Sequence, residues 1–254
     1  MRHVTVRPGD PEGPGAAAGW SAGTVARVDP GAGEDVTARE KTATIEIEVG
    51  VVLVALVALA GAYLAWRPES GTIDGWFFGI FPTTKNGAFT AITTLRQPWL
   101  VIVGSVVVCA ATVSRDLPRA LACLVGPPAA LIAAEVVAKP LVGRTLGGGL
   151  SYPSGSTVGA AALACAVVLA TPPAFRTASV VLGALYAFWM TLAVVAAGWH
   201  YPTDAFAGLA LGVGTVLLAD GLFRRVADAF RPARAAGRGH LRRAHLRRAH
   251  PRHS

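Results

Sequence analysis

The chain has 254 residues, of which 53% are hydrophobic and 15% charged, with a mean hydropathy of +0.49 and a formal net charge of +8 at pH 7. A soluble globular domain carries more charge and fewer apolar residues, so this composition excludes that class and predicts a membrane protein. The three cysteines, Cys109, Cys123 and Cys165, fall inside apolar segments, where we expect small packing residues rather than a metal site.

Residues 1–44 are rich in glycine, proline, alanine and mixed charge, and they lack apolar periodicity. A segment of this kind cannot bury enough apolar surface to fold, so we expect a disordered N-terminal tail over 1–44. The first apolar run also starts too late in the chain for a standard signal peptide. The membrane domain is therefore expected over residues 45–223.

Six apolar segments follow, and each is a candidate helix across the bilayer, which takes about 20 apolar residues per helix. They cover residues 49–66, 98–113, 120–138, 156–170, 178–198 and 205–219. Pro127 and Pro128 are expected to kink the third segment. The fourth and sixth are short and need a few flanking residues. The sequence thus predicts an all-α, polytopic membrane protein, a six-helix transmembrane bundle.

The longest loop between these segments, residues 67–97, contains the stretch IDGWFFGIF. One interpretation is a short amphipathic helix at the membrane interface, with Trp76 and the phenylalanines dipping into lipid. The alternative is a loop that packs on the bundle. The sequence leaves both interpretations open.

The C-terminal tail, residues 224–254, carries ten arginines against one acidic residue, Asp228, and ends in HLRRAHLRRAHPRHS. We expect it to bind anionic membrane lipid, at about 1 kcal/mol per basic residue near the surface. A nucleic-acid contact has no supporting fold, so none is expected. The neighbouring arginines disfavour metal binding by the four histidines of the tail.

The same tail predicts the orientation of the chain. Basic residues near membrane segments stay cytoplasmic. With an even number of segments, both termini are then cytoplasmic, and we expect an integral protein of the plasma (inner) membrane. The loops after the third and fifth segments fall on the outer face.

Polar residues gather in these two outer loops. Lys139 and Arg144 supply positive charge, and PSGS at residues 153–156 begins a helix, so its N–H groups and the Ser154 hydroxyl can cradle an anion. Lys139 could instead snorkel to the interface or pair with Glu135. Ser154 could instead cap the helix that it precedes.

His200 and Asp204 stand in the second loop, four residues apart, a spacing that lets them meet on one helical turn. A carboxylate on one imidazole nitrogen fixes the tautomer and raises the basicity of the other nitrogen. That arrangement suits a nucleophilic or general-base histidine. The alternative is a pair that only caps a helix. Combined with the positive charge and the anion cradle, the pair favours phosphate chemistry.

The order of these groups resembles the membrane branch of the phosphatidic acid phosphatase type 2 and haloperoxidase superfamily, over roughly residues 60–222. That signature has three parts: Lys, six residues, Arg-Pro; Pro-Ser-Gly-His; and Ser-Arg, five residues, His, three residues, Asp. Lys139, the Pro-Ser-Gly of residues 153–155, His200 and Asp204 match it, and HYPTDAFAG is the most characteristic piece.

The resemblance implies a helical core of six spans with a site on the outer face. It implies hydrolysis of lipid phosphates or diphosphates through a phosphohistidine, without a metal or another cofactor. In that reaction His200 would be the nucleophile and Asp204 the acid that orients it.

Three parts of the signature are changed in this chain. Leu146 and Gly147 stand for Arg-Pro, and Ala193 and Val194 stand for Ser-Arg. Ser156 stands where a second histidine would protonate the leaving group. We expect Arg144 to replace the first missing arginine in part. The residues expected to hold the phosphoryl oxygens are Lys139, Arg144, Ser154, Gly155 and Ser156.

The change at Ser156 bears on the substrate, because a general acid contributes typically about 10²–10⁴-fold to a rate. A diphosphate leaving group needs less protonation than an alkoxide, which favours a polyprenyl diphosphate over a phosphatidic acid. The first hypothesis is therefore a lipid phosphate or polyprenyl diphosphate hydrolase with an altered site. The alternative is a non-catalytic protein that binds a lipid phosphate or scaffolds other membrane proteins.

Overall fold

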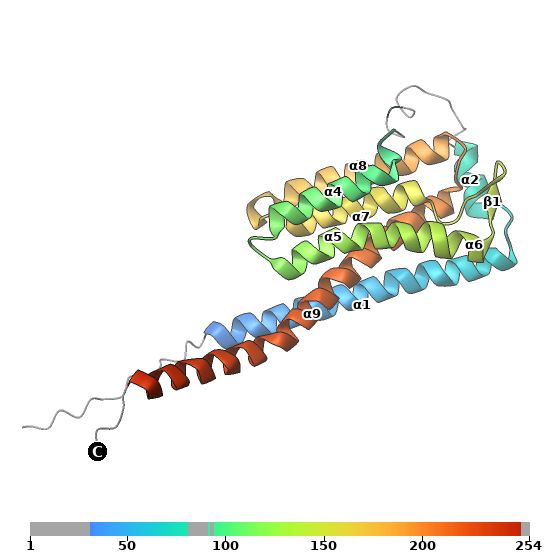
Figure 1. Ribbon diagram of the computed structural model, residues 1–254. Helices are drawn as coiled ribbons and strands as arrows, with labels where there is room; N and C mark the ends of the chain where they lie inside the picture. Colours follow the sequence, from blue (N-terminus) through green and yellow to red (C-terminus); the bar gives the residue numbers. More distant parts are fainter. Residues whose placement is uncertain (1–30, 81–90, 92–93, 250–254) are drawn as a thin grey trace, which may run out of the picture.

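The computed structural model describes residues 31–80, 91 and 94–249, which form a bundle of long helices (Figure 1). In chain order the elements are α1 (Gly31–Trp66), α2 (Thr72–Ile80), η1 (Thr94–Arg96), α4 (Pro98–Thr112), α5 (Leu117–Ile132), the π-helical η2 (Ala133–Ala138), α6 (Lys139–Val142), β1 (Thr145–Leu146), β2 (Gly149–Leu150), α7 (Gly155–Ala170), η3 (Pro173–Phe175), α8 (Arg176–Ala196) and α9 (Pro202–Ala249). Apart from the two short strands, the fold is helical, as predicted.

Helix α9 holds the bundle together, because it packs against α1, α5 and α7. Figure 1 shows α1 and α9 leaving one end of the bundle side by side, while α2 and β1 lie at the other end. Small residues allow the two long helices to approach closely. A β-carbon on Gly50 of α1 would lie 2.8 Å from the carbonyl oxygen of Gly214 on α9. Close backbone contacts of this kind are typical of helix packing in membranes.

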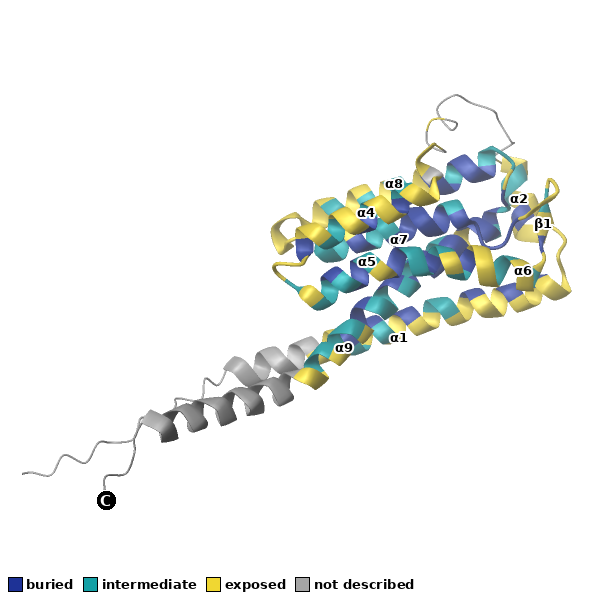
Figure 2. Ribbon diagram, viewed as in Figure 1, coloured by how far each residue is buried: buried dark blue, intermediate teal, exposed yellow. Residues whose placement is uncertain are grey.

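The outer surface of the bundle is apolar. Figure 2 shows exposed positions along the outward faces of α1, α4 and α8, and buried positions concentrated in α7. Leu59, Val107 and Leu182 are each more than 60% exposed, which water would penalise and lipid does not. The exterior therefore fits a membrane protein.

The structure supports four of the six predicted membrane spans. Four helical segments are long and apolar enough to cross a membrane, namely Glu40–Trp66, Leu117–Val142, Pro173–Ala196 and Pro202–Phe230. Helices α4 and α7 coincide with two further predicted segments but have 15 and 16 residues. At 1.5 Å per residue they reach about 22–24 Å, less than the roughly 30 Å of the hydrocarbon core.

Helix α1 begins earlier than predicted. Residues 31–44 are helical, which corrects the expected disorder over that part of the tail; residues 1–30 lie outside the described part. Ala43 is fully buried, and its carbonyl oxygen would lie 2.8 Å from a β-carbon on Gly221 of α9. Packing against α9 thus stabilises helical structure in a segment whose composition predicted disorder.

Helix α9 also runs past the predicted start of the C-terminal tail and reaches Ala249. Arg225 Nη2 donates to Thr44 Oγ1 at 2.6 Å, so the first tail residues belong to the α1–α9 contact. The side chains beyond Phe230, and residues 250–254, lie outside the described part, and with them the histidine-rich repeat.

The stretch after α1 forms the helix α2, as one of the two interpretations predicted. Trp76 is 64% exposed, whereas Asp74 on the same helix is fully buried. The helix therefore turns Trp76 outward, whereas Phe77 and Phe78 are half-buried and pack against the bundle. The predicted short helix is present with Trp76 exposed, but these two phenylalanines contact the bundle, as the alternative interpretation expected of the stretch.

Candidate active site

A tight hairpin shapes the loop between α6 and α7. Strands β1 and β2 are antiparallel, with Thr145 opposite Leu150. Gly147 and Gly148 connect them with φ values of 60° and 84°. Positive φ at both central positions is typical of a type I′ turn, which glycine adopts without strain. The loop is thereby folded back toward the bundle.

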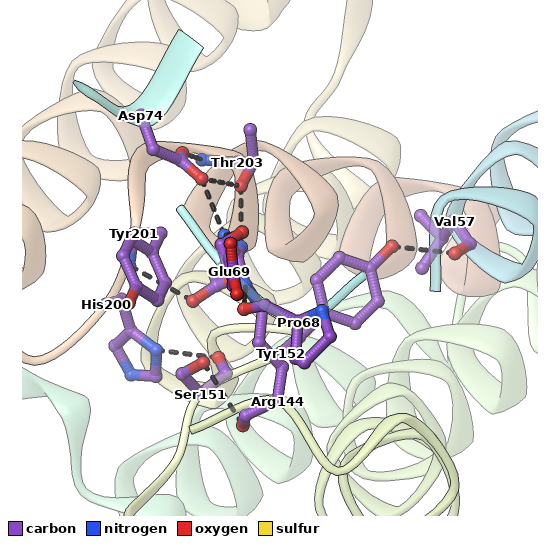
Figure 3. Close-up of polar contacts among 11 residues, drawn as sticks. Val57, Pro68, Glu69, Asp74, Arg144, Ser151, Tyr152, His200, Tyr201 and Thr203 are labelled. Carbon is purple, nitrogen blue, oxygen red and sulfur yellow. Dashed lines mark hydrogen bonds and ion pairs between the residues drawn. The ribbon is translucent and has the colours of Figure 1, made fainter. Parts of the chain in front are cut away.

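Arg144 precedes this hairpin and lies fully buried at the centre of a charge cluster (Figure 3). Its acceptors come from three segments, and they are the carbonyls of Pro68 (3.2 Å) and Glu69 (3.3 Å), Thr203 Oγ1 (2.8 Å), Asp74 Oδ2 (2.6 Å) and Asp204 Oδ1 (2.6 Å). These five bonds match the five N–H donors of a guanidinium. The Tyr201 ring covers one face, with its centroid 3.9 Å from Cζ.

This geometry corrects the prediction that Arg144 holds phosphate. The side chain is 0% exposed, and its donors are bound to α2, to the loop after α1 and to the first turn of α9. Burial disfavours its charge, but the hydrogen bonds to Asp74 and the interaction with Asp204 outweigh burial and raise its pKa. Arg144 therefore stays charged and joins three segments, and it does not reach a ligand.

His200 lies in the turn between α8 and α9, and its Nδ1 is 2.8 Å from the Ser151 carbonyl oxygen (Figure 3). A carbonyl oxygen can only accept, so Nδ1 carries the proton and the lone pair of the neutral ring is on Nε2. Ser151 in turn donates its N–H (2.8 Å) and its hydroxyl (3.3 Å) to the Arg144 carbonyl. The Arg144 cluster thus positions His200 through Ser151.

Asp204 has different contacts from those predicted. Its Oδ1 accepts from Arg144, and its Oδ2 accepts from the Tyr201 N–H at 3.0 Å. Helix α9 begins at Pro202, so His200 precedes the helix and does not share a turn with Asp204. The hydrogen bond that fixes Nδ1 of His200 is the one to Ser151. Asp204 acts on His200 through the cluster.

A pocket of about 490 Å³ opens beside His200, bordered by α4, α5, η2, α6 and the first turn of α7. Its polar lining consists of His200, Lys139, Glu135, Ser156 and Gln97. The rest of its wall is apolar or glycine, and consists of Pro98, Ile102, Pro128, Leu131, Ile132, Val136 and Gly155. The pocket thus combines a histidine and a lysine with an apolar wall.

The structure brings four predicted residues together in this pocket: Lys139, Gly155, Ser156 and His200. Lys139 Nζ is 2.8 Å from both carboxylate oxygens of Glu135, the pairing that the sequence offered as an alternative. Ser154 is not among the lining residues. Its hydroxyl oxygen accepts from the Thr157 N–H (3.5 Å) and hydroxyl (3.1 Å), so it caps α7, which corrects its expected contact with phosphate.

A family model described as the PAP2 superfamily matches residues 100–226, half of the chain. The chain belongs to the PAP2 superfamily. The resemblance to the phosphatidic acid phosphatase type 2 superfamily is thereby confirmed, and with it a phosphatase-type hydrolase of phosphate-bearing lipids at the level of the superfamily. No curated protein and no solved structure matches the chain. The PAP2 match covers every residue that lines the pocket except Gln97 and Pro98, and it does not include α1 or α2.

The altered PAP2 signature has a structural explanation at two positions. Proline is fixed near φ −65°, so the signature Arg-Pro could not occupy Leu146 and Gly147, where Gly147 has φ 60°. Val194 is fully buried among Met190, Val195 and Ala205, where an arginine would place its charge in an apolar cluster. Neither Leu146 nor Val194 is among the described residues that line the pocket.

Sequence reasoning missed two residues of the site, Asp74 and Ser151. Asp74 carries a usable signal, because an acid in an otherwise apolar, aromatic stretch needs a buried partner. Ser151 carries none, because it holds His200 through its main-chain oxygen. Tyr152, the next residue, is buried and donates its hydroxyl to the Val57 carbonyl at 2.6 Å, and burial raises its pKa to about 12. This bond anchors the loop on α1.

Proposed function

We propose that this protein hydrolyses a lipid phosphate or polyprenyl diphosphate in the membrane, through a phosphohistidine on His200. The observation that carries the proposal is the pocket that joins His200 and Lys139 to an apolar wall. Lys139 would neutralise the phosphoryl oxygens. Gly155 and Ser156, the first residues of α7, would offer N–H groups at the positive end of a helix.

The apolar side of the pocket supports a lipid as the substrate. Ile102, Ile132 and Val136 are each more than half exposed on the outside of the bundle. A chain lying along them would remain in contact with the bilayer while its head group reached His200. The volume of about 490 Å³ fits the usual range for small-ligand pockets, roughly 300–1,000 Å³.

The chemistry takes two displacements at phosphorus. Nε2 of His200 attacks, so that an N–P bond forms and the bond to the leaving oxygen breaks. Water then attacks the phosphohistidine and releases phosphate. Ser156 cannot supply the proton that a histidine would give, so the leaving group has to be a weak base. A diphosphate, whose leaving group is itself a phosphate, meets this requirement better than a monophosphate ester.

The proposed topology has six membrane passes, both termini in the cytoplasm and the pocket on the outer face of the plasma membrane. Three observations support it. The start of α1 and the end of α9 leave the bundle opposite the hairpin (Figure 1). The residues that lead into the short helix α7, from Ser151 to Gly155, are buried in the protein. Backbone that is not helical can lie within the membrane when protein surrounds it, so this segment can complete the pass that α7 makes. The arginine-rich tail favours the anionic cytoplasmic leaflet, where it would bind lipid.

The direct test is phosphate release by the purified protein over a panel of lipid monophosphates and diphosphates. We expect release from a polyprenyl diphosphate, and we expect His200→Ala to abolish it. Equal release by both proteins would contradict the proposal. Saturable binding of a lipid phosphate without release would favour the second candidate, a non-catalytic binding protein, for which the changed signature is the supporting observation.

A further inference from the structure

Glu135 brings a carboxylate to the point where the signature histidine is missing. It lines the pocket together with Ser156 and His200. Its Oε1 lies so close to Gly155 that a β-carbon built on Gly155 would overlap it. The carboxylate therefore packs against the first residue of α7, next to Ser156 in the chain. A group that can accept a proton thus lies beside Ser156, the position at which the signature histidine is missing.

The backbone around Glu135 is a π-helix rather than a regular α-helix. Glu135 lies in the π-helical η2, between α5 and α6, and Lys139 follows directly. Such π-turns are rare and occur frequently at functional sites. The Lys139–Glu135 ion pair contributes too little stability to explain why the π-helical turn is there. The Glu135 side chain is 47% exposed, and pairs of that kind contribute about 0–1 kcal/mol.

Resting on the function proposed above, we infer that Glu135 is the general base of the second step, whereas the proton donation expected of the histidine absent at Ser156 has no replacement. Its carboxylate accepts a proton from water while the water oxygen attacks phosphorus. The O–P bond forms, the P–N bond breaks, and His200 recovers its Nε2 lone pair. Phosphate leaves, and Glu135 returns its proton to solvent.

The ion pair with Lys139 indicates that Glu135 acts as a base rather than as an acid. As the anionic partner of Lys139, the carboxylate has no proton to donate to a leaving group. The first step therefore proceeds without an acid, which agrees with a diphosphate substrate. Lys139 remains beside both anions, where it offsets the repulsion between the carboxylate and the phosphoryl group.

The test follows both products of a polyprenyl diphosphate in a single turnover by the purified full-length protein. In Glu135→Gln we expect about one equivalent of polyprenyl monophosphate, as in the wild type. Release of inorganic phosphate should slow by at least about 10²-fold, the lower end for one general base. Adding Ser156→His to this variant should restore phosphate release by at least tenfold. Glu48→Gln, exposed on α1, is the matched control and should behave as the wild type.

Each other outcome excludes the inferred base. Unchanged phosphate release would leave Glu135 as a partner of Lys139 alone. Faster release would show that the carboxylate repels the substrate. An equal loss of both products would show a role in binding; Glu135→Asp, which keeps a carboxylate, should retain part of the phosphate release and covers the case of a glutamine variant that does not fold. Absence of both products in the wild type would instead refute the proposed function, and the base with it.

Discussion

The two ends of the bundle each hold a cluster of buried charges, and the two clusters differ in how fully their polar atoms are bonded. At the pocket end, Arg144 has an acceptor for each of its five donors. At the other end, Asp220 meets Arg224 at 3.0 Å and Arg119 at 3.5 Å. Four buried side-chain atoms there have no hydrogen-bond partner among the described residues, namely Glu46 Oε2, Arg119 Nε, Asp220 Oδ1 and Arg224 Nη2.

The difference in hydrogen bonding indicates which end of the bundle is held in a fixed geometry. A fully bonded polar cluster rigidifies its surroundings, whereas each unsatisfied buried group costs about 1–3 kcal/mol. The rigid cluster holds Ser151, and Ser151 holds His200. Arg144, which the sequence assigned to the substrate, therefore helps to position His200. The far cluster joins α1, α5 and α9 with less complete bonding.

Breaking the pocket-end cluster should have the largest effect. Arg144→Met leaves Asp74 and Asp204 buried without their cation, and we expect a loss of about 3–5 kcal/mol in the free energy of unfolding. Thermal or denaturant unfolding in detergent measures it. Arg67→Met is the control, because Arg67 is exposed and stacks on Trp66. A loss no larger than that of the control would show that the cluster does not stabilise the fold.

Breaking the far cluster should cost less. Arg119→Met removes a contact of 3.5 Å to Asp220, which keeps Arg224 at 3.0 Å. We expect a loss of about 1 kcal/mol, in the range of an ordinary hydrogen bond. The same unfolding assay compares it with Arg144→Met. Losses of equal size would contradict the difference between the two ends.

Repairing the far cluster should have the smallest effect, and one of opposite sign. Glu46→Gln supplies an amide donor near the Asp220 carboxylate, and it removes a carboxylate whose Oε2 has no hydrogen-bond partner among the described residues and lies 3.7 Å from Arg224 Nε. We expect a gain of about 0.5–1.5 kcal/mol in the free energy of unfolding. Glu48→Gln, an exposed neighbour on the same helix, should change little. A destabilised Glu46→Gln protein would mean that the charge of Glu46 outweighs its missing bond.

The sequence predicted the parts of this fold that depend on local patterns. The apolar segments became helices because burial and lipid both reward continuous apolar surface. Lys139, Gly155, Ser156 and His200 meet in one pocket, as expected for two polar loops that lie at the same end of the bundle. The start of α1 could not be predicted, because Ala43 is buried by α9, far away in the chain.

The roles inside the site were harder to predict for the same reason. The partner of Arg144 on α2, Asp74, lies 70 residues away and belongs to no motif. The group on Nδ1 of His200 is a main-chain oxygen, which any residue could supply. The four-residue spacing of His200 and Asp204 predicted a shared turn, but Pro202 starts the helix between them. In each case the sequence suggested a contact between neighbours in the chain, whereas the contact that forms depends on how distant segments pack.

The central claim is that His200 is the nucleophile of a pocket that cleaves phosphate from a lipid. The most direct measurement uses a polyprenyl diphosphate labelled on its terminal phosphate, an alkaline quench that preserves phosphohistidine, and identification of the labelled residue by mass spectrometry. We expect acid-labile label on His200, more of it in Glu135→Gln, and none in His200→Ala. Phosphate release with label on another residue, or with no labelled residue in any of these proteins, would contradict the account.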